Sequence, residues 1–131
     1  MSDPLAPQSE RGALPRWQVL LLAPLGGVLL TLSLAPFNLW PTAVIGCALL
    51  AYLLAGCTAR QALWRGWLFG LGLFGSGCSW VYVSIHVYGH ASVALATALT
   101  VLFCAGLAIL HALQAWVYVR FVRPLPGGML L

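Results

Sequence analysis

Few residues in this chain of 131 residues could do chemistry, because it has four cysteines, three histidines, two acidic residues and no lysine. The acids Asp3 and Glu10 both precede the first apolar run, so no cysteine has a general base near it in the sequence. No pair of cysteines has the spacing of a zinc site. We therefore predict no catalytic residue and no metal site among the cysteines, which are Cys47, Cys57, Cys78 and Cys104.

The histidines offer a second kind of site. His86 and His90 are four residues apart and could share one face of a helix, whereas His111 lies in a later apolar run. A haem would need histidines at similar depth on facing helices, and the topology predicted below places His111 toward the other end of the bundle. We therefore expect no cofactor. We expect His86 and His90 to be loop residues and His111 to hydrogen-bond within the bundle.

The composition identifies the class of protein that holds these residues. Hydrophobic residues make up 62% of the chain and charged residues only 6%, against about 45–50% and about 25% in soluble domains. Disordered chains are poor in apolar residues, so both classes are excluded. A transmembrane helix needs about 20 apolar residues, so the chain has room for about four. We predict an all-α membrane protein that is part of a larger helical bundle.

Four apolar runs predict the helices 17–35, 41–56, 62–85 and 91–119, which form a transmembrane domain over residues 17–120. A flexible tail, 1–16, precedes this domain, and the end 121–131 follows it. Pro24 predicts a kink in the first helix. A cleaved signal peptide ending near Ala35 is the alternative for the start, but the run is long for one and is interrupted by Pro24.

The six arginines indicate the orientation. With four crossings, all six lie on one side of the membrane, so the positive-inside rule places both termini in the cytoplasm. Their arrangement as pairs beside apolar runs is typical of membrane-flanking anchors. We therefore interpret the net charge of +4 in this way and expect no nucleic-acid partner.

The third run is rich in small residues. Glycines and serines fall on two roughly opposite stripes of a helix over 62–85, which predicts close neighbours on two sides. One of these stripes could instead leave space for a lipid chain, and the residues alone do not separate the two interpretations.

The stretch from Phe69 to Ile85 closely resembles the third transmembrane segment of bacterial apolipoprotein N-acyltransferases. Its most specific part is Gly75-Ser76-Gly77 followed by Trp80-Val81-Tyr82-Val83-Ser84-Ile85, and Tyr88-Gly89 fits the turn that the family has next. The stretch from Leu34 to Pro41 is similar to the family's turn between its first two helices. The resemblance covers roughly residues 17–120.

This resemblance implies a multi-pass protein of the bacterial inner membrane. The family transfers an acyl chain from a phospholipid to the N-terminal diacylglyceryl-cysteine of lipoproteins. The implied partners are therefore a phospholipid acyl donor, a lipoprotein substrate and membrane lipids. The family's reaction passes through a thioester on a cysteine, with a glutamate as base and a lysine beside the oxyanion, all in a nitrilase-like domain.

This chain departs from the family pattern because the nitrilase-like domain is not present and only about half of the family's helices are. We expect an N-terminal membrane portion that is inactive alone. The alternatives are a non-catalytic membrane interaction module and a small helical transporter, although a proton-coupled transporter would carry an acid within its membrane segments. The motif residues expected along the lipid path are Gly75, Ser76, Gly77, Trp80, Tyr82 and Ser84.

Overall fold

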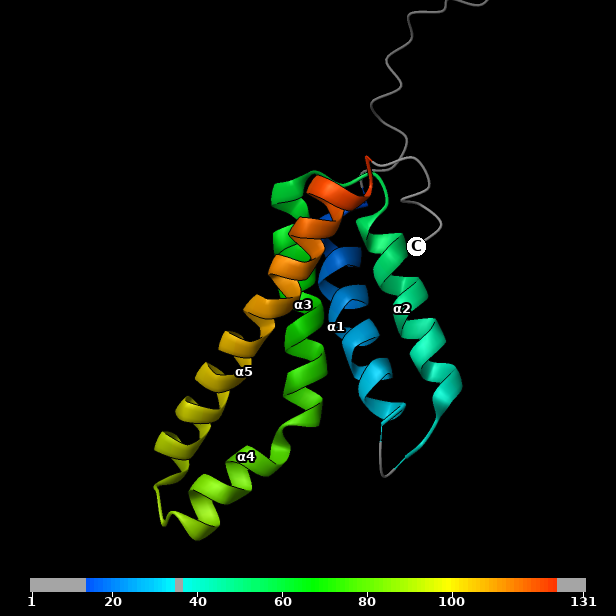
Figure 1. Ribbon diagram of the computed structural model, residues 1–131. Coiled ribbons are helices and arrows are strands. Elements are labelled where there is room, and N and C mark those ends of the chain that lie inside the picture. Colours follow the sequence, from blue (N-terminus) through cyan, green and yellow to red (C-terminus); the bar gives the residue numbers. More distant parts are fainter. Residues whose placement is uncertain (1–13, 35–36, 125–131) are drawn as a thin grey trace, which may run out of the picture.

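The computed structural model describes residues 14–34 and 37–124, and every regular element in them is a helix (Figure 1). The expectation of an all-α protein is thus confirmed for the described residues. The elements, two of them π-helical, are α1 (Arg16–Leu32), α2 (Trp40–Leu54), α3 (Ala59–Gly77), α4 (Ser79–Val83), η2 (Ser84–Tyr88), α5 (Val93–Val117) and η3 (Tyr118–Val122).

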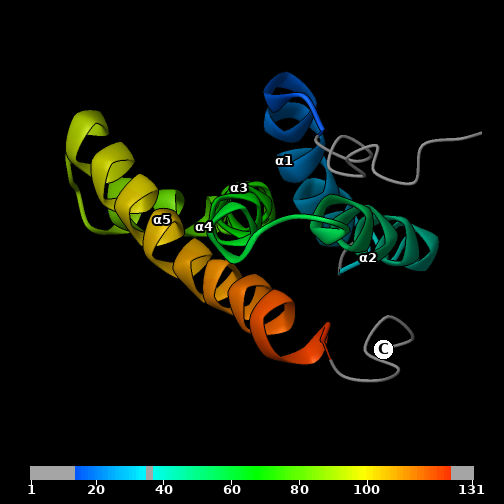
Figure 2. The same ribbon diagram turned by 90° about the horizontal axis from the view of Figure 1, so that it is seen from above.

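Helix α3 occupies the centre of the structure. It packs against α1 on one side and α5 on another, while α2 packs mainly on α1 (Figure 2). On the α5 side, a β-carbon at Gly66 would lie 2.6 Å from the backbone oxygen of His111. The two packing faces predicted for this segment are therefore found. Gly75 is an exception, since a β-carbon there would meet nothing within 4 Å.

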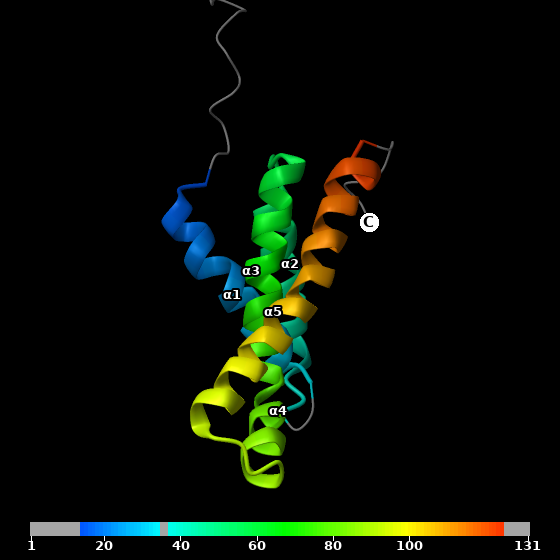
Figure 3. The same ribbon diagram turned by 90° about the vertical axis from the view of Figure 1, so that its left-hand side faces the viewer.

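The contact between α1 and α3 is made by backbone against backbone. A β-carbon at Gly72 would lie 2.1 Å from the oxygen of Pro24, and one at Gly27 would lie 2.1 Å from the oxygen of Phe69. Any side chain larger than hydrogen is thus excluded at both positions. Helix α1 starts away from α3 and approaches it toward its C-terminal end (Figure 3). The small residues of α3 serve this approach, as they do in membrane bundles.

Helix α3 begins at a capping box and ends in a sharp break. The side chain of Thr58 accepts a hydrogen bond from the backbone N–H of Gln61, and the Gln61 side chain accepts one from the N–H of Thr58. At Cys78 the chain bends by 55° into α4 and η2. The prediction of one helix over 62–85 was wrong in this respect. The sequence Gly-Ser-Gly before Cys78 is a poor helix former, and Ser76 Oγ lies 2.6 Å from the carbonyl oxygen of Gly72, a contact that often bends helices.

One continuous helix, Val93–Val122, is long and apolar enough to cross a membrane, and α3 together with α4 and η2 makes a second if the bent pair is one span. Helices α1 and α2 are apolar but have only 17 and 15 residues. At about 1.5 Å per residue they are shorter than a hydrocarbon core of about 30 Å. The four-span count therefore stays a prediction. The expected tail and C-terminal end lie largely outside the described residues, as do Ala35 and Pro36.

Candidate functional site

Three of the six motif residues form an exposed face at the end of α3. Gly75, Ser76 and Gly77 are all exposed immediately before the break at Cys78. A β-carbon at Gly77 would approach only the Thr31 side chain, at 3.5 Å, and the space beside Gly75 is open. The small residues here do not serve packing within the described bundle, in contrast to Gly72 one turn earlier.

The position of this face is fixed by hydrogen bonds to α1. The hydroxyl of Thr31 donates to the carbonyl oxygen of Leu73, at 2.9 Å. Ser76 Oγ lies 2.9 Å from Thr31 Oγ1. These two hydrogen bonds join the last turn of α1 to the last turns of α3. They hold the break in a defined place relative to α1.

The other three motif residues lie beyond the break. The indole of Trp80 is 62% exposed. The ring of Tyr82 instead stacks on His86, with ring centroids 5.5 Å apart. Ser84 is exposed, and its carbonyl oxygen accepts a hydrogen bond from the N–H of Gly89. The structure thus brings Gly75–Gly77 together on one face, but it gives Tyr82 and Ser84 local roles in the turn that follows.

His86 is not a loop residue, because it lies in η2. Its Nδ1 lies 2.9 Å from the carbonyl oxygen of Ala91, which closes the turn between η2 and α5. His90 does lie in that turn, with a positive φ of 51°. In the part of the chain that the structure describes, no group of three histidines, cysteines or acids could hold a metal ion.

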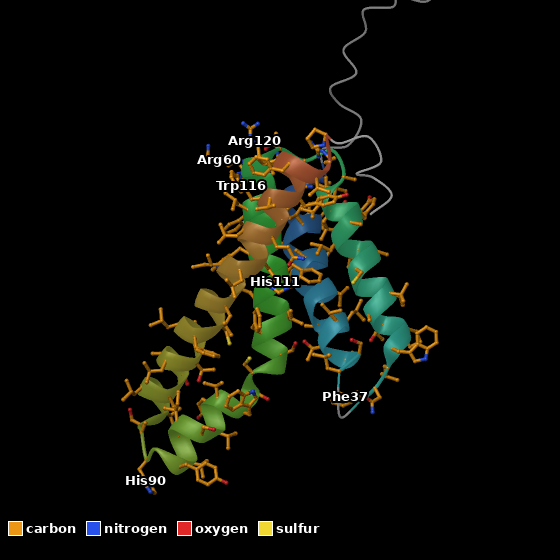
Figure 4. All side chains as sticks on the ribbon, viewed as in Figure 1. Phe37, Arg60, His90, His111, Trp116 and Arg120 are labelled. Carbon is orange, nitrogen blue, oxygen red and sulfur yellow. The ribbon has the colours of Figure 1, made fainter. Side chains whose placement is uncertain are left out.

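A cavity of about 390 Å³ opens between α2, α3 and α5, and it was not predicted from the sequence. Its polar lining comes from His111, Gln114 and Tyr118 on the α5 side, and α2 supplies Cys47 and three apolar residues. His111 points into the middle of the bundle (Figure 4). Its ring packs against Phe69, at 6.0 Å between centroids, and Phe74, at 5.5 Å.

The expectation that His111 hydrogen-bonds within the bundle was wrong for Nδ1. This atom is buried and has no hydrogen-bond partner among the described residues. Two phenylalanine rings enclose the imidazole, and a phenyl ring offers no lone pair or strong donor. Packing, and not polarity, fixes the orientation of this side chain.

Two arginines bind the end of α2 at the opposite end of the bundle from the motif. Arg65 is only 5% exposed and donates to the carbonyl oxygen of Leu53. Arg123 donates to the carbonyl oxygens of Cys57, at 2.9 Å, and Leu54, at 3.4 Å. The interpretation of all arginines as membrane-flanking anchors was therefore incomplete. These two satisfy carbonyl groups that a helix leaves without partners at its C-terminus, where positive charge is also favoured.

Cys57 lies in the connection between α2 and α3 and is buried beside these arginines. Burial raises the pKa of its thiol, and the charges of Arg65 and Arg123 oppose this effect only in part. Sγ donates to the carbonyl oxygen of Leu54. A thiol kept protonated is a poor nucleophile, so the geometry supports a structural role for Cys57.

Residues 26–131 match the family described as the apolipoprotein N-acyltransferase N-terminal domain. The chain belongs to the apolipoprotein N-acyltransferase family. This confirms the resemblance found in the sequence from Phe69 to Ile85.

Individual relatives agree with this assignment, and each carries the name apolipoprotein N-acyltransferase. The protein from Pseudomonas paraeruginosa is 53% identical over 109 residues, which cover 83% of this chain and 21% of the relative. The protein from Pseudomonas syringae pv. tomato is 50% identical over 83% of this chain and 22% of its own length. That from Coxiella burnetii is 47% identical over 79% of this chain and 21% of its own length. The chain thus matches about a fifth of the length of these relatives.

Proposed function

We propose that this chain is the N-terminal membrane portion of an enzyme that transfers an acyl chain from a phospholipid to the N-terminal diacylglyceryl-cysteine of lipoproteins. The family match over residues 26–131 supports the enzyme class. The observation that carries the role of this portion is the exposed small-residue face at Gly75–Gly77, beside which the structure leaves open space.

This face suits an acyl chain for a physical reason. Moving a lipid chain out of the bilayer costs about 0.8 kcal/mol for each CH₂ group. A surface that stays at membrane depth avoids this cost while it guides the chain. Gly75 and Gly77 contribute no side chain that would occupy the space, and the exposed indole of Trp80 follows directly after the break. In this proposal Tyr82 and Ser84 shape the turn beyond the break.

The chemical step belongs to other parts of the enzyme in this proposal. The family's reaction needs a thiolate with a base beside it. The chain has no lysine, and both of its acids lie outside the described residues. We therefore expect the isolated chain to show no acyl transfer.

We further propose a multi-pass location in the bacterial inner membrane with both ends on the cytoplasmic side. Arg16 lies at the start of α1, Arg60 at the start of α3 and Arg120 in η3, and these elements share one end of the bundle (Figures 1 and 4). The connections at the other end, over 37–39 and 89–92, contain no arginine. Alkaline phosphatase fused after Gly89 should be active and fused after Gly56 inactive. The reverse pattern would contradict this orientation.

A chimera tests the proposed function as a whole. In the chimera, this chain replaces the matching segment of the relative from Pseudomonas paraeruginosa, and the chimera is expressed in cells depleted of their own enzyme. We expect growth to be restored. A chimera that reaches the membrane in normal amount but fails to support growth would contradict the proposal.

Two substitutions in this chimera test the role of the small-residue face. Gly75→Leu fills the open space beside α3, and we expect it to reduce acylation about tenfold or more. Gly106→Leu on α5 is the matched control, because a β-carbon there also meets nothing within 4 Å. Equal activity of both variants would remove the acyl-chain role from Gly75 while leaving the enzyme assignment intact.

A further inference from the structure

A second cavity lies at the arginine-rich end of the bundle, far from the motif face. Its volume is about 320 Å³, and it is lined by Ala59, Val119, Arg120, Arg123 and Pro124. The first residue of α3 forms one wall, and η3 with the two residues that follow it forms the other. Two guanidinium groups thus share one small concave space.

One of these arginines is held in place by the protein itself. Arg123 uses Nη1 to donate to the carbonyl oxygens of Cys57 and Leu54. A guanidinium group has five N–H donors in a rigid plane, so this anchoring fixes its orientation and leaves further donors for a ligand. Such preorganised donors lose little conformational entropy when a ligand binds.

The second arginine has no partner within the described part of the chain. Arg120 is exposed and donates no hydrogen bond to any described residue. Residues 14–34 and 37–124 contain no Asp or Glu, so no carboxylate among them neutralises either guanidinium. Ala59 also brings the first turn of α3 to the cavity, where the helix dipole is positive. The cavity is therefore electropositive on each side.

We propose that this cavity binds the phosphate of an anionic phospholipid headgroup, a function independent of acyl transfer. Arginine matches phosphate through paired hydrogen bonds. The source of the phosphate follows from the surroundings, since η3 beside the cavity continues α5, and together they form the one described helix that is long and apolar enough by itself to span a membrane. Exposed leucines and Phe121 on this helix would lie against the acyl chains of the same lipid. Basic pockets between helices are known to take such headgroups.

The test uses the full 131-residue chain in detergent and native mass spectrometry. Phosphatidylglycerol is the anionic probe, phosphatidylethanolamine is the zwitterionic comparison, and glycerol 3-phosphate is the soluble phosphate ester. We expect phosphatidylglycerol to bind about tenfold more tightly than phosphatidylethanolamine. Equal affinity for the two lipids would overturn the proposal. Displacement of phosphatidylglycerol by equimolar glycerol 3-phosphate would contradict the proposal that the bound phosphate belongs to a lipid.

Variants show whether the cavity, and not the general positive charge of this end of the bundle, is responsible for binding phosphatidylglycerol. Arg120→Gln should lower phosphatidylglycerol affinity about fivefold, because it removes one of the two guanidinium groups that would pair with the phosphate in the cavity. Arg16→Gln is the matched control, because it removes an exposed arginine of the same end that does not line the cavity. It should change affinity less than twofold. An equal loss of phosphatidylglycerol affinity in both variants would overturn the proposal that the lipid binds in this cavity.

Ala59→Glu provides a second test without removing an arginine. It places a carboxylate on the cavity wall at the first turn of α3, where an acid favours the helix. We expect normal helix content by circular dichroism together with loss of the preference for phosphatidylglycerol. A folded Ala59→Glu variant that retains this preference would contradict the proposal.

Discussion

The carbonyl oxygen of Pro24 lies 2.1 Å from the position that a β-carbon on Gly72 would occupy. Helices α1 and α3 are therefore in backbone contact at this point. The Thr31–Ser76 contact lies further along the same pair of helices, at 2.9 Å. The exposed face at Gly75–Gly77 depends on both, because they set where α3 ends relative to α1.

Replacing Gly72 by alanine should force the two helices apart. Overpacking of this kind costs about 1–3 kcal/mol, and we expect the upper part of that range because the clash is with backbone. Unfolding in mixed detergent and SDS micelles measures the effect. Gly75→Ala is the control and should leave the free energy of unfolding within about 0.5 kcal/mol. Equal stability of the two variants would contradict the observed contact.

Thr31→Val should weaken the joint between α1 and α3. It removes the hydroxyl that donates to the Leu73 carbonyl and contacts Ser76. Interhelical hydrogen bonds in membrane proteins contribute about 0.6 kcal/mol on average, so a loss of about 0.5–1.5 kcal/mol is expected. Thr97→Val is the matched control, because the Thr97 hydroxyl donates to the carbonyl oxygen of Val93 in its own helix. A double-mutant cycle with Ser76→Ala would show no coupling if this joint were unimportant.

Arg65→Met should destabilise the protein although it removes a charge from the interior. The carbonyl oxygen of Leu53 would lose its donor, and an unsatisfied buried polar group costs about 1–3 kcal/mol. Arg60→Met removes an exposed arginine from the same helix and should have little effect. Thermal unfolding in detergent compares the two. If the Arg65 variant were as stable as the Arg60 variant, its guanidinium would not be a structural donor.

Cys57 should make the stability of the protein fall at alkaline pH. Its thiol pKa is raised by burial, so folding favours the protonated form. That contribution is fully present below the ordinary thiol pKa of about 8.5. It is lost as the pH rises from there through the raised pKa of the folded state. Unfolding measured from pH 7 to pH 10 should show this decline in the native protein and a smaller one in Cys57→Ala. Cys47→Ala, which removes an exposed cysteine from α2, should behave like the native protein.

The sequence predicted the all-α class because the chain consists of apolar runs separated by short polar or proline-containing connections. Pro41 lies in the first turn of α2, where its missing N–H costs no helical hydrogen bond. The break at Cys78 was missed because apolar residues continue on both sides of it. The Gly-Ser-Gly sequence was the available signal, but it was interpreted as packing surface or as space for a lipid chain and not as the end of a helix. Its effect on direction depends on the contact with Thr31, a residue 45 positions away.

The arginines show a second limit of sequence reasoning. Position and charge were enough to predict that they gather at one end of the bundle. Neither could show that Arg65 and Arg123 donate to carbonyl groups 12 and 66 residues away. Such bonds depend on the tertiary arrangement of α2, α3 and η3. For the same reason the cavity beside His111, which residues of three helices surround, had no signal in the sequence.

The bonds from Arg123 have a consequence for the order of biosynthesis. The carbonyl groups of Leu54 and Cys57 are made early, but their donor is synthesised 66 to 69 residues later. Until Arg123 is synthesised, the Cys57 carbonyl lacks the donor that it has in the folded chain, whereas the Leu54 carbonyl can already accept from the N–H and the Sγ of Cys57. The turn between α2 and α3 can therefore reach its final hydrogen bonding only after Arg123, the last described arginine, has been synthesised.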